Sequence, residues 1–282
     1  MSLQHLLDTF DFEQTGPTSF TASSMSEGPG QVVFGGQLLA QSIVAASTVV
    51  PDKELKTLHT IFARGASNEL PLDLEVDVIQ AGRAFASVSI SFRQNDKSCV
   101  RATALLHAPD PDLIRYTAPK PAVGKPDDAA ARPGMDWWEV RFVDDVDIDD
   151  PALIGPPELD VWTRFPGAPA DPVTNQALLA YATDGFLIAT AMRPHEGVGQ
   201  SLAHTAISTT VLSHTLTFHE PVDASSWLLL TNESPYAGRG RSYGRANVFT
   251  EEGALVASYV QDNMIRDFPK GQAPAPGETS KT

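Results

Sequence analysis

Residues 177–192 read ALLAYATDGFLIATAM, and this stretch decides the fold. It is apolar on almost every side at helical spacing, which predicts a helix buried all round rather than an amphipathic helix at the surface. Asp184 is its only charged residue, and Gly185 beside it weakens a helix interior by roughly 1 kcal/mol. A second helical pattern covers 37–49, where Gly35 and Gly36 open it and Pro51 ends it.

Four strand-like segments follow each predicted helix. They alternate apolar and polar residues with a period of two, which predicts an antiparallel sheet covered on one face. The segments are 57–63, 74–78, 88–92 and 100–106 in the first half, and 207–219, 227–233, 241–250 and 254–265 in the second. Residues 10–22 and 136–146 are candidates for one earlier strand before each helix.

The two halves repeat at one offset. Ala81-Gly82-Arg83 returns 156 residues later as Ala237-Gly238-Arg239, and the same offset maps Phe62 onto Phe218. We therefore predict an α+β fold in which one helix-and-sheet unit is built twice. The predicted units are 1–108 and 135–269, joined by a linker at 109–134 that holds six prolines and followed by a flexible tail at 270–282.

The composition excludes several classes of function. Among 282 residues, 20 Lys and Arg stand against 35 Asp and Glu, and the net charge of −15 argues against nucleic acid or an anionic membrane as a partner. The single cysteine, Cys99, forms no internal disulfide, so nothing demands an oxidising compartment. The sequence has no signal-peptide pattern and no apolar run near the roughly 18 residues that span a membrane. We expect a soluble, cytoplasmic protein.

Four motifs resemble those of the type II acyl-CoA thioesterases, the TesB-like family, and occur in the family's order. They are VFGGQ at 33–37, LAYATD at 179–184, HTLTFH at 214–219 and VASYVQ at 256–261. The resemblance implies the double hot-dog fold, in which an antiparallel sheet wraps round a long helix twice in one chain. It also implies hydrolysis of acyl-CoA to a fatty acid and coenzyme A, no cofactor or metal, and a homodimer or larger homo-oligomer.

Asp184 and Gln261 are the first candidate catalytic residues. A buried carboxylate is costly unless it is paired, and burial raises its pKa; the alternative is that Asp184 points into solvent or caps a neighbouring segment. Gln261 shares a strand face with Ala257 and Tyr259, where an amide can donate and accept and so hold a water; the alternative is a polar strand end at the rim. The resemblance places the family's catalytic Asp and Gln at these positions.

The third catalytic residue that the resemblance implies, a Thr or Ser three positions before His214, falls on Val211. We predict that the adjacent Thr210 takes this role if a bulge turns it inward, because a shift of one residue along a strand reverses the side chain. Loss of the role is the alternative. Gly35 and Gly36 are candidates for an oxyanion site, since the first N–H groups of a helix are unpaired; an ordinary loop-to-helix turn explains the pair equally well.

Two other motifs do not fit the chemistry they suggest. Residues 240–244 match the G-x-S-x-G pattern, but the repeat places them in a strand rather than a strand–turn–helix. Asp145, Asp147 and Asp149 have calcium-loop spacing, but Asp150 and Pro156 stand where such a loop needs Gly and Glu. Two alternatives to a thioesterase stay open: a non-catalytic acyl-CoA-binding protein, suggested by Val211, and a hot-dog enoyl-thioester hydratase, whose Gly-Asp-x-Asn-Pro pattern the sequence lacks.

Overall fold

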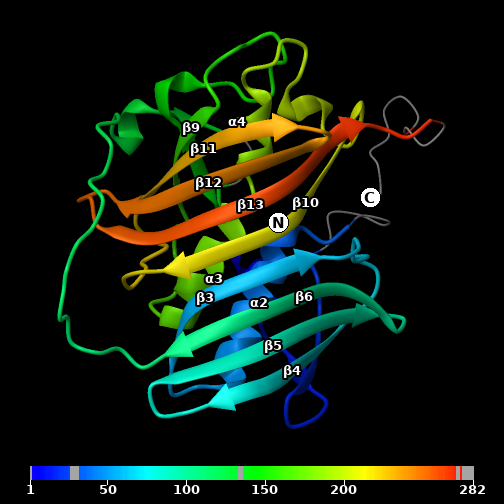
Figure 1. Ribbon diagram of the computed structural model, residues 1–282, viewed down its shortest axis with the longest axis vertical. Helices are drawn as coiled ribbons and strands as arrows, with labels where there is room; N and C mark the ends of the chain where they lie inside the picture. Colours follow the sequence, from blue (N-terminus) through cyan, green and yellow to red (C-terminus); the bar gives the residue numbers. More distant parts are fainter. Residues whose placement is uncertain (1, 26–31, 133–135, 271–273, 275–282) are drawn as a thin grey trace.

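A single antiparallel sheet runs through both halves of the chain in the computed structural model, which describes residues 2–25, 32–132, 136–270 and 274 (Figure 1). The first half contributes β1 (Glu13–Gln14), β2 (Ser19–Ala22), β3 (Glu54–Phe62), β4 (Leu72–Ala81), β5 (Phe85–Gln94) and β6 (Lys97–His107). The second contributes β7 (Ala130–Ala131), β8 (Glu139–Phe142), β9 (Glu158–Arg164), β10 (Ile207–Phe218), β11 (Leu228–Gly238), β12 (Arg241–Thr250) and β13 (Leu255–Asp267). The strand order is β1-β2-β4-β5-β6-β3-β10-β13-β12-β11-β9-β8-β7, so the halves join where β3 pairs with β10.

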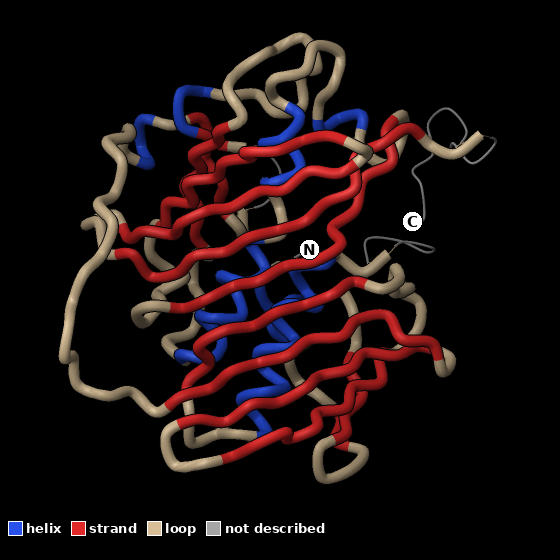
Figure 2. Tube along the Cα trace, viewed as in Figure 1, coloured by secondary structure: helices blue, strands red, loops and turns tan. Residues whose placement is uncertain are grey.

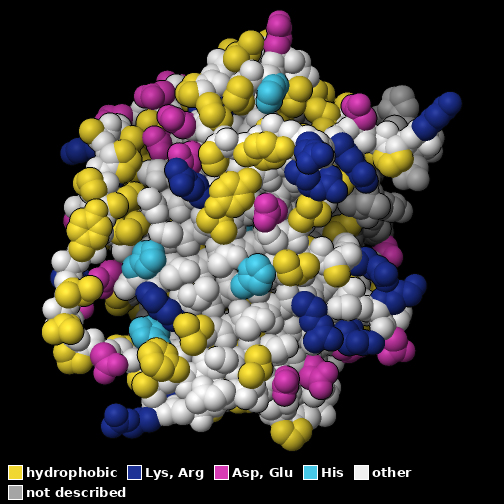
Figure 3. Space-filling model, viewed as in Figure 1, with side chains coloured by type: hydrophobic (Ala, Val, Ile, Leu, Met, Phe, Trp, Pro, Cys, Tyr) yellow, Lys and Arg dark blue, Asp and Glu magenta, His cyan; other side chains and the backbone are white. Residues whose placement is uncertain are grey.

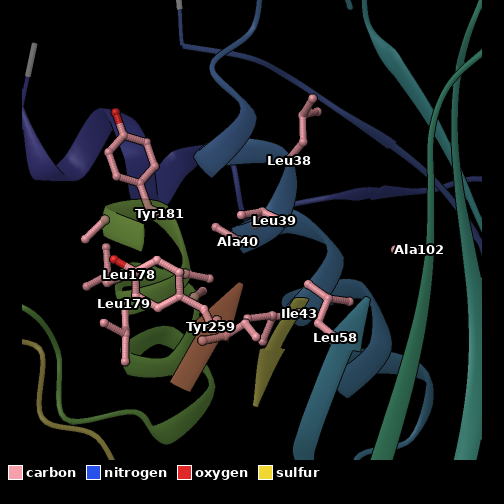
Figure 4. Packing of buried hydrophobic residues seen from close by; sticks show 14 of the residues in the cluster. Leu38, Leu39, Ala40, Ile43, Leu58, Ala102, Leu178, Leu179, Tyr181 and Tyr259 are labelled. Atoms are coloured by element: carbon pink, nitrogen blue, oxygen red, sulfur yellow. The ribbon is translucent and has the colours of Figure 1, made fainter. Parts of the chain in front are cut away.

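Two buried helices, α2 (Gly35–Val49) and α3 (Pro172–Thr183), lie on one face of this sheet (Figure 2). Shorter helical segments are α1 (Leu3–Asp8), α4 (Leu187–Met192), η1 (Pro126–Asp128), η2 (Val143–Asp145) and η3 (Gln200–Leu202). Figure 4 shows the apolar side chains that pack between α2, α3 and the sheet, among them Leu39, Ile43 and Leu179. Because α2 is covered by the sheet and by α3, most of its residues are buried, and it needs no polar stripe. None of the helices within the described ranges is long and apolar enough to cross a bilayer.

The strands confirm the predicted repeat. Shifting β5 by 156 residues places it on β12 from end to end, and the same shift carries β4 onto β11 within one residue. Each half therefore has a helix on the inner face of a three-stranded meander, β4-β5-β6 or β11-β12-β13, whose last strand also pairs with the strand that precedes the meander in sequence, β3 or β10. The predicted α+β double hot-dog fold is confirmed.

The predicted helix at 177–192 is wrong in its extent, because two helices occupy this range. The first, α3, begins earlier, at Pro172, where the Thr174 N–H donates to the Asp171 carboxylate at 2.7 Å. It ends at Thr183 with Asp184 as its C-cap, and α4 starts only at Leu187. The break occurs because the Asp184 side chain binds groups of other elements, as described below, and Gly185 offers little helix propensity.

The early strands differ from the prediction in the second half. Residues 136–146 include β8, but the strand beside β11 is β9, at Glu158–Arg164, which the sequence analysis missed. Strand β7 lies inside the predicted linker at 109–134, so strand pairing in the second half begins before residue 135. Residues 133–135 and, apart from Pro274, 271–282 lie outside the described residues; the division into two units and a flexible tail stays a prediction.

The outer face of the sheet, opposite the helices, is largely uncharged over its middle strands (Figure 3). Thr57 and Thr217 place their hydroxyls 3.3 Å apart there, and Nδ1 of His59 lies 2.7 Å from the Thr215 hydroxyl. Strands β1 and β7 lie at the two ends of the strand order, but β2 pairs with β4 only at residues 72–75, so among the described strands residues 76–81 of β4 have a partner on one side alone. The homodimer or larger assembly that the resemblance implies stays a prediction.

Candidate active site

Asp184 lies at the turn between α3 and α4, against the N-terminus of α2. Its carboxylate accepts a hydrogen bond from Nε2 of Gln261, 2.8 Å from Oδ1, and another from the backbone N–H of Gly36. Only 8% of the residue is exposed. Burial raises the pKa of Asp184 to about 7, although the Gly36 and Gln261 hydrogen bonds stabilise the ionised form and oppose the shift. A carboxyl group with this pKa can accept and return a proton at neutral pH, as a general base must.

Gly35 and Gly36 let the N-terminus of α2 approach Asp184 and α3 closely. A Cβ at Gly35 would lie 2.5 Å from Oδ2 of Asp184, and a Cβ at Gly36 would lie 2.4 Å from the Tyr181 carbonyl oxygen. The two glycines are therefore required by the close approach of α2 to α3. The Gly36 N–H interacts with the Asp184 carboxylate and lowers its pKa, and the oxyanion role of Gly35 and Gly36 stays a prediction. The positive end of the α2 dipole favours the ionised form of that carboxylate.

Gln261 reaches Asp184 from the inner face of β13, as predicted for a residue that shares a face with Ala257 and Tyr259. The residue is 1% exposed. Its amide nitrogen donates to Oδ1 of Asp184 at 2.8 Å and lies 3.3 Å from Nδ1 of His214. Its carbonyl oxygen Oε1 is buried and has no hydrogen-bond partner in the described part of the chain. Oε1 of Gln261 is therefore free to accept a hydrogen bond from a water molecule beside the Asp184 carboxylate.

His214 connects Gln261 to the end of α3. Nε2 of the ring lies 3.1 Å from the Thr183 hydroxyl, which itself donates to the Ala180 carbonyl at 2.8 Å. The ring is fully buried and stacks on Tyr259, with centroids 5.4 Å apart and an angle of 14° between the planes. Burial lowers the pKa of His214 to about 3, so the ring is neutral. In the sequence, His214 is visible only as part of the HTLTFH motif, and these contacts depend on residues far from it in the chain.

Thr210 is not in the site, and the prediction that it replaces the family's Thr or Ser is wrong. Strand β10 carries a bulge between Val211 and Ser213. Paired residues point to the same side of a sheet, and Val211 pairs with the buried Asn263, whereas Thr210 pairs with Met264. The bulge does exist, but it keeps Val211 on the inner face with Gln261 and turns Thr210 to the outer face.

Two further polar residues of the inner face were missed by the sequence analysis. Thr60 of β3 pairs with His214, and Asn263 of β13 lies two residues beyond Gln261 on the same side. Both are fully buried, and within the described ranges neither the Thr60 hydroxyl nor Oδ1 of Asn263 has a hydrogen-bond partner. Unpaired buried polar atoms are commonly satisfied by ordered water. In the sequence, Thr60 could have been recognised as a site residue because it is a polar residue at an inward position of the segment 57–63.

Other candidate motifs lie away from this site. Ser242, the serine of the G-x-S-x-G match, lies within β12 and is buried, as the repeat predicts. In the acidic loop, Asp147 accepts the Asp149 N–H and Asp149 binds Arg132, and across the described residues no cluster of acidic, His or Cys side chains is able to hold a metal ion. A cavity of about 200 Å³ lies beside the C-terminal end of α4, and its lining does not include Asp184.

Comparison with known proteins identifies the family of this chain. Residues 23–107 match the family described as "Acyl-CoA thioesterase N-terminal domain", and residues 125–265 match "Acyl-CoA thioesterase C-terminal domain". The chain is 28% identical to acyl-CoA thioesterase 2 of Haemophilus influenzae, over 94% of this chain and 98% of that protein. It is 27% identical to the crystal structure of acyl-CoA thioesterase II TesB2 from Mycobacterium marinum and 26% identical to the tesB protein of Mycobacterium avium subsp. paratuberculosis. Each of these two structures gives a TM-score of 0.79 and coverage of 94% of this chain and 99% of the other.

The repeated sheet-and-helix units and these matches define the class of protein as a double hot-dog thioester hydrolase. Since the family's two domains together match 23–107 and 125–265, the chain belongs to the acyl-CoA thioesterase family.

Proposed function

We propose that this chain hydrolyses acyl-CoA to a free fatty acid and coenzyme A, with water as the nucleophile and Asp184 as the general base. The observation that carries the proposal is the 2.8 Å bond between the buried Asp184 carboxylate and the Gln261 amide. The bond holds a carboxyl group with a pKa of about 7 beside a buried acceptor that has no partner among the described residues. A thioester carbonyl is electrophilic enough for a positioned, partly deprotonated water to attack it.

Gln261 and Asp184 orient the water through its two protons. The water donates one hydrogen bond to Oε1 of Gln261 and the other to the Asp184 carboxylate, which leaves an oxygen lone pair free for the carbonyl carbon. As the carbon–oxygen bond forms, the proton moves to Asp184, and when the carbon–sulfur bond breaks, the proton returns to the sulfur of coenzyme A. Because the Gly36 N–H is engaged by Asp184, we assign the developing oxyanion to the neighbouring N–H of Gly35 at the start of α2.

A non-catalytic acyl-CoA-binding protein is the second candidate, because Val211 places an apolar side chain on the inner face where the family's Thr or Ser is expected. Among the described residues, none of those around Asp184 favours the hydratase alternative. Thiol release from saturated acyl-CoAs of several chain lengths separates the possibilities. Release supports the proposed hydrolysis, binding without release favours the second candidate, and hydration of an enoyl-CoA without thiol release favours the hydratase.

The pH dependence of hydrolysis should follow the titration of Asp184. The base accepts a proton only when it is ionised, and its pKa is about 7, so kcat/KM should rise with pH, reach half its maximum near pH 7 and then level off. Initial rates at acyl-CoA concentrations below KM, taken between about pH 5 and pH 9, measure this profile. A rate that stays constant from pH 5 to pH 8 would contradict the assignment of Asp184 as base.

A further inference from the structure

A chain of hydrogen bonds runs from the backbone of α3 to the Asp184 carboxylate. Thr183 donates to the Ala180 carbonyl at 2.8 Å, and its hydroxyl oxygen lies 3.1 Å from Nε2 of His214. On the other side of the ring, Nδ1 lies 3.3 Å from the Gln261 amide nitrogen, which donates to Asp184 at 2.8 Å. All four side chains are buried, so water from bulk solvent does not compete for these bonds.

The position of each proton in this series of hydrogen bonds follows from the number of protons that each side chain carries. A threonine hydroxyl has one proton, and that of Thr183 is used on the Ala180 carbonyl, so toward His214 the hydroxyl can only accept. Nε2 of His214 is therefore the protonated nitrogen. Because the buried ring is neutral, Nδ1 carries no proton and can only accept. The Gln261 group that faces Nδ1 must then be the NH2 group, which has two protons, one for His214 and one for Asp184.

We infer that Thr183 and His214 are positioning residues that fix the orientation of the Gln261 amide. In the opposite orientation, Oε1 of Gln261 would face the unprotonated Nδ1 of His214 and the Asp184 carboxylate, so two pairs of acceptors would meet in a buried site. The observed orientation commits both amide protons and leaves Oε1 for the water. This consequence for catalysis rests on the proposed function, whereas the orientation itself rests on the contacts alone.

The orientation also affects the acidity of Asp184. The amide N–H of Gln261 stabilises the ionised carboxylate and lowers its pKa, so an amide carbonyl in its place raises the pKa. The groups that face Asp184 are the Gly36 N–H from α2 and Gln261 from β13; Tyr259, on the same strand, is the titratable side chain that interacts with it electrostatically. Burial raises the pKa of Tyr259 well above its ordinary value and lowers the pKa of His214 to about 3, so both side chains stay uncharged near pH 7.

Thr183→Val in the full-length protein tests the inference, because it keeps the volume of the side chain and removes the acceptor for Nε2 of His214. The ring can then protonate Nδ1 and the Gln261 amide can turn. We expect kcat at pH 7 to fall about tenfold with little change in KM, and the pKa of Asp184 to rise. The pKa is measured independently of activity from the ¹³C-carboxyl titration of Asp184, assigned by its loss in Asp184→Asn.

Two matched variants separate positioning from packing. Thr183→Ser keeps the hydroxyl and should restore both the rate and the titration. Thr190→Val is the control, because Thr190 of α4 is equally buried and its hydroxyl also donates to a backbone carbonyl, that of Phe186 at 2.9 Å, with no histidine attached. His214→Phe, which can keep the stacking on Tyr259, provides a second test if Thr183→Val does not fold.

The outcomes are distinct. A raised Asp184 pKa in Thr183→Val or His214→Phe, with Thr183→Ser and Thr190→Val like the wild type, supports the inference. The same Asp184 titration in Thr183→Val, His214→Phe, Thr190→Val and the wild type overturns it. If the wild-type protein releases no thiol but the titration shifts as expected, the proposed function fails and the positioning role of Thr183 and His214 stands.

Discussion

Replacing Asp184 by asparagine should abolish most of the hydrolysis of acyl-CoA. The substitution keeps the volume of the side chain and one acceptor for Gln261 or Gly36, but an amide does not take a proton from water. General-base contributions are roughly 10²–10⁴-fold, and we expect kcat to fall within that range while KM changes little. Thiol release at pH 8 with saturating acyl-CoA measures the effect, because the wild-type carboxyl group is mostly ionised there.

Thr210→Val is the matched control for this experiment. Thr210 is close in sequence to His214, but its side chain lies on the outer face of β10. The kinetics of Thr210→Val should therefore equal those of the wild type. Activity of Asp184→Asn within about threefold of the wild type would show that another group is the base.

The stability of Asp184→Asn relative to the wild type tests whether burial disfavours the ionised form of Asp184. Its pKa is about 7 in the folded chain against 3.8 ordinarily, so between these values the folded chain holds a proton that the unfolded chain releases. The free energy of unfolding of the wild type should therefore fall by about 3 kcal/mol, relative to Asp184→Asn, as the pH rises from about 4 to 7. Urea denaturation of both proteins at several pH values measures the difference.

The strand pattern could be predicted from the sequence because burial alternates along each strand. Buried residues recur at every second position along most of β5 and β12, and the shift of 156 residues relates the two strands from end to end. The same regularity placed Gln261 on the inner face. This alternation can be recognised within a single strand, because it does not depend on which other strand is its partner.

The bulge in β10 and the break after Thr183 could not be predicted in the same way. Around Leu212 the sequence reads TTVLSH, with no glycine or proline to mark an extra residue, so the inner position of Val211 depends on pairing with β13. The break at Asp184 depends on bonds to Gly36 and Gln261, which lie 148 residues before it and 77 residues after it. Contacts of this range override local helix propensity.

Gly35→Ala should cost activity, whereas Gly36→Ala should cost stability, because the two added methyl groups meet different atoms. A Cβ at Gly35 lies 2.5 Å from Oδ2 of Asp184, the end of a side chain that can rotate away. The carboxylate then leaves its position beside Gln261, and displacement of a catalytic group by about 1 Å can reduce turnover about 10²-fold. Thiol release and thermal melting of the same preparation measure both quantities.

At Gly36 the added Cβ lies 2.4 Å from the carbonyl oxygen of Tyr181, which is part of α3 and cannot rotate away. Helices α2 and α3 must then separate, and overpacking of this kind costs about 1–3 kcal/mol. Gly124→Ala, where the added Cβ meets only the Asp128 side chain at 3.9 Å, is the control for the substitution itself. Alanine favours a helix over glycine by roughly 1 kcal/mol, so a Gly36→Ala protein more stable than the wild type would show that α2 and α3 are not held in this contact.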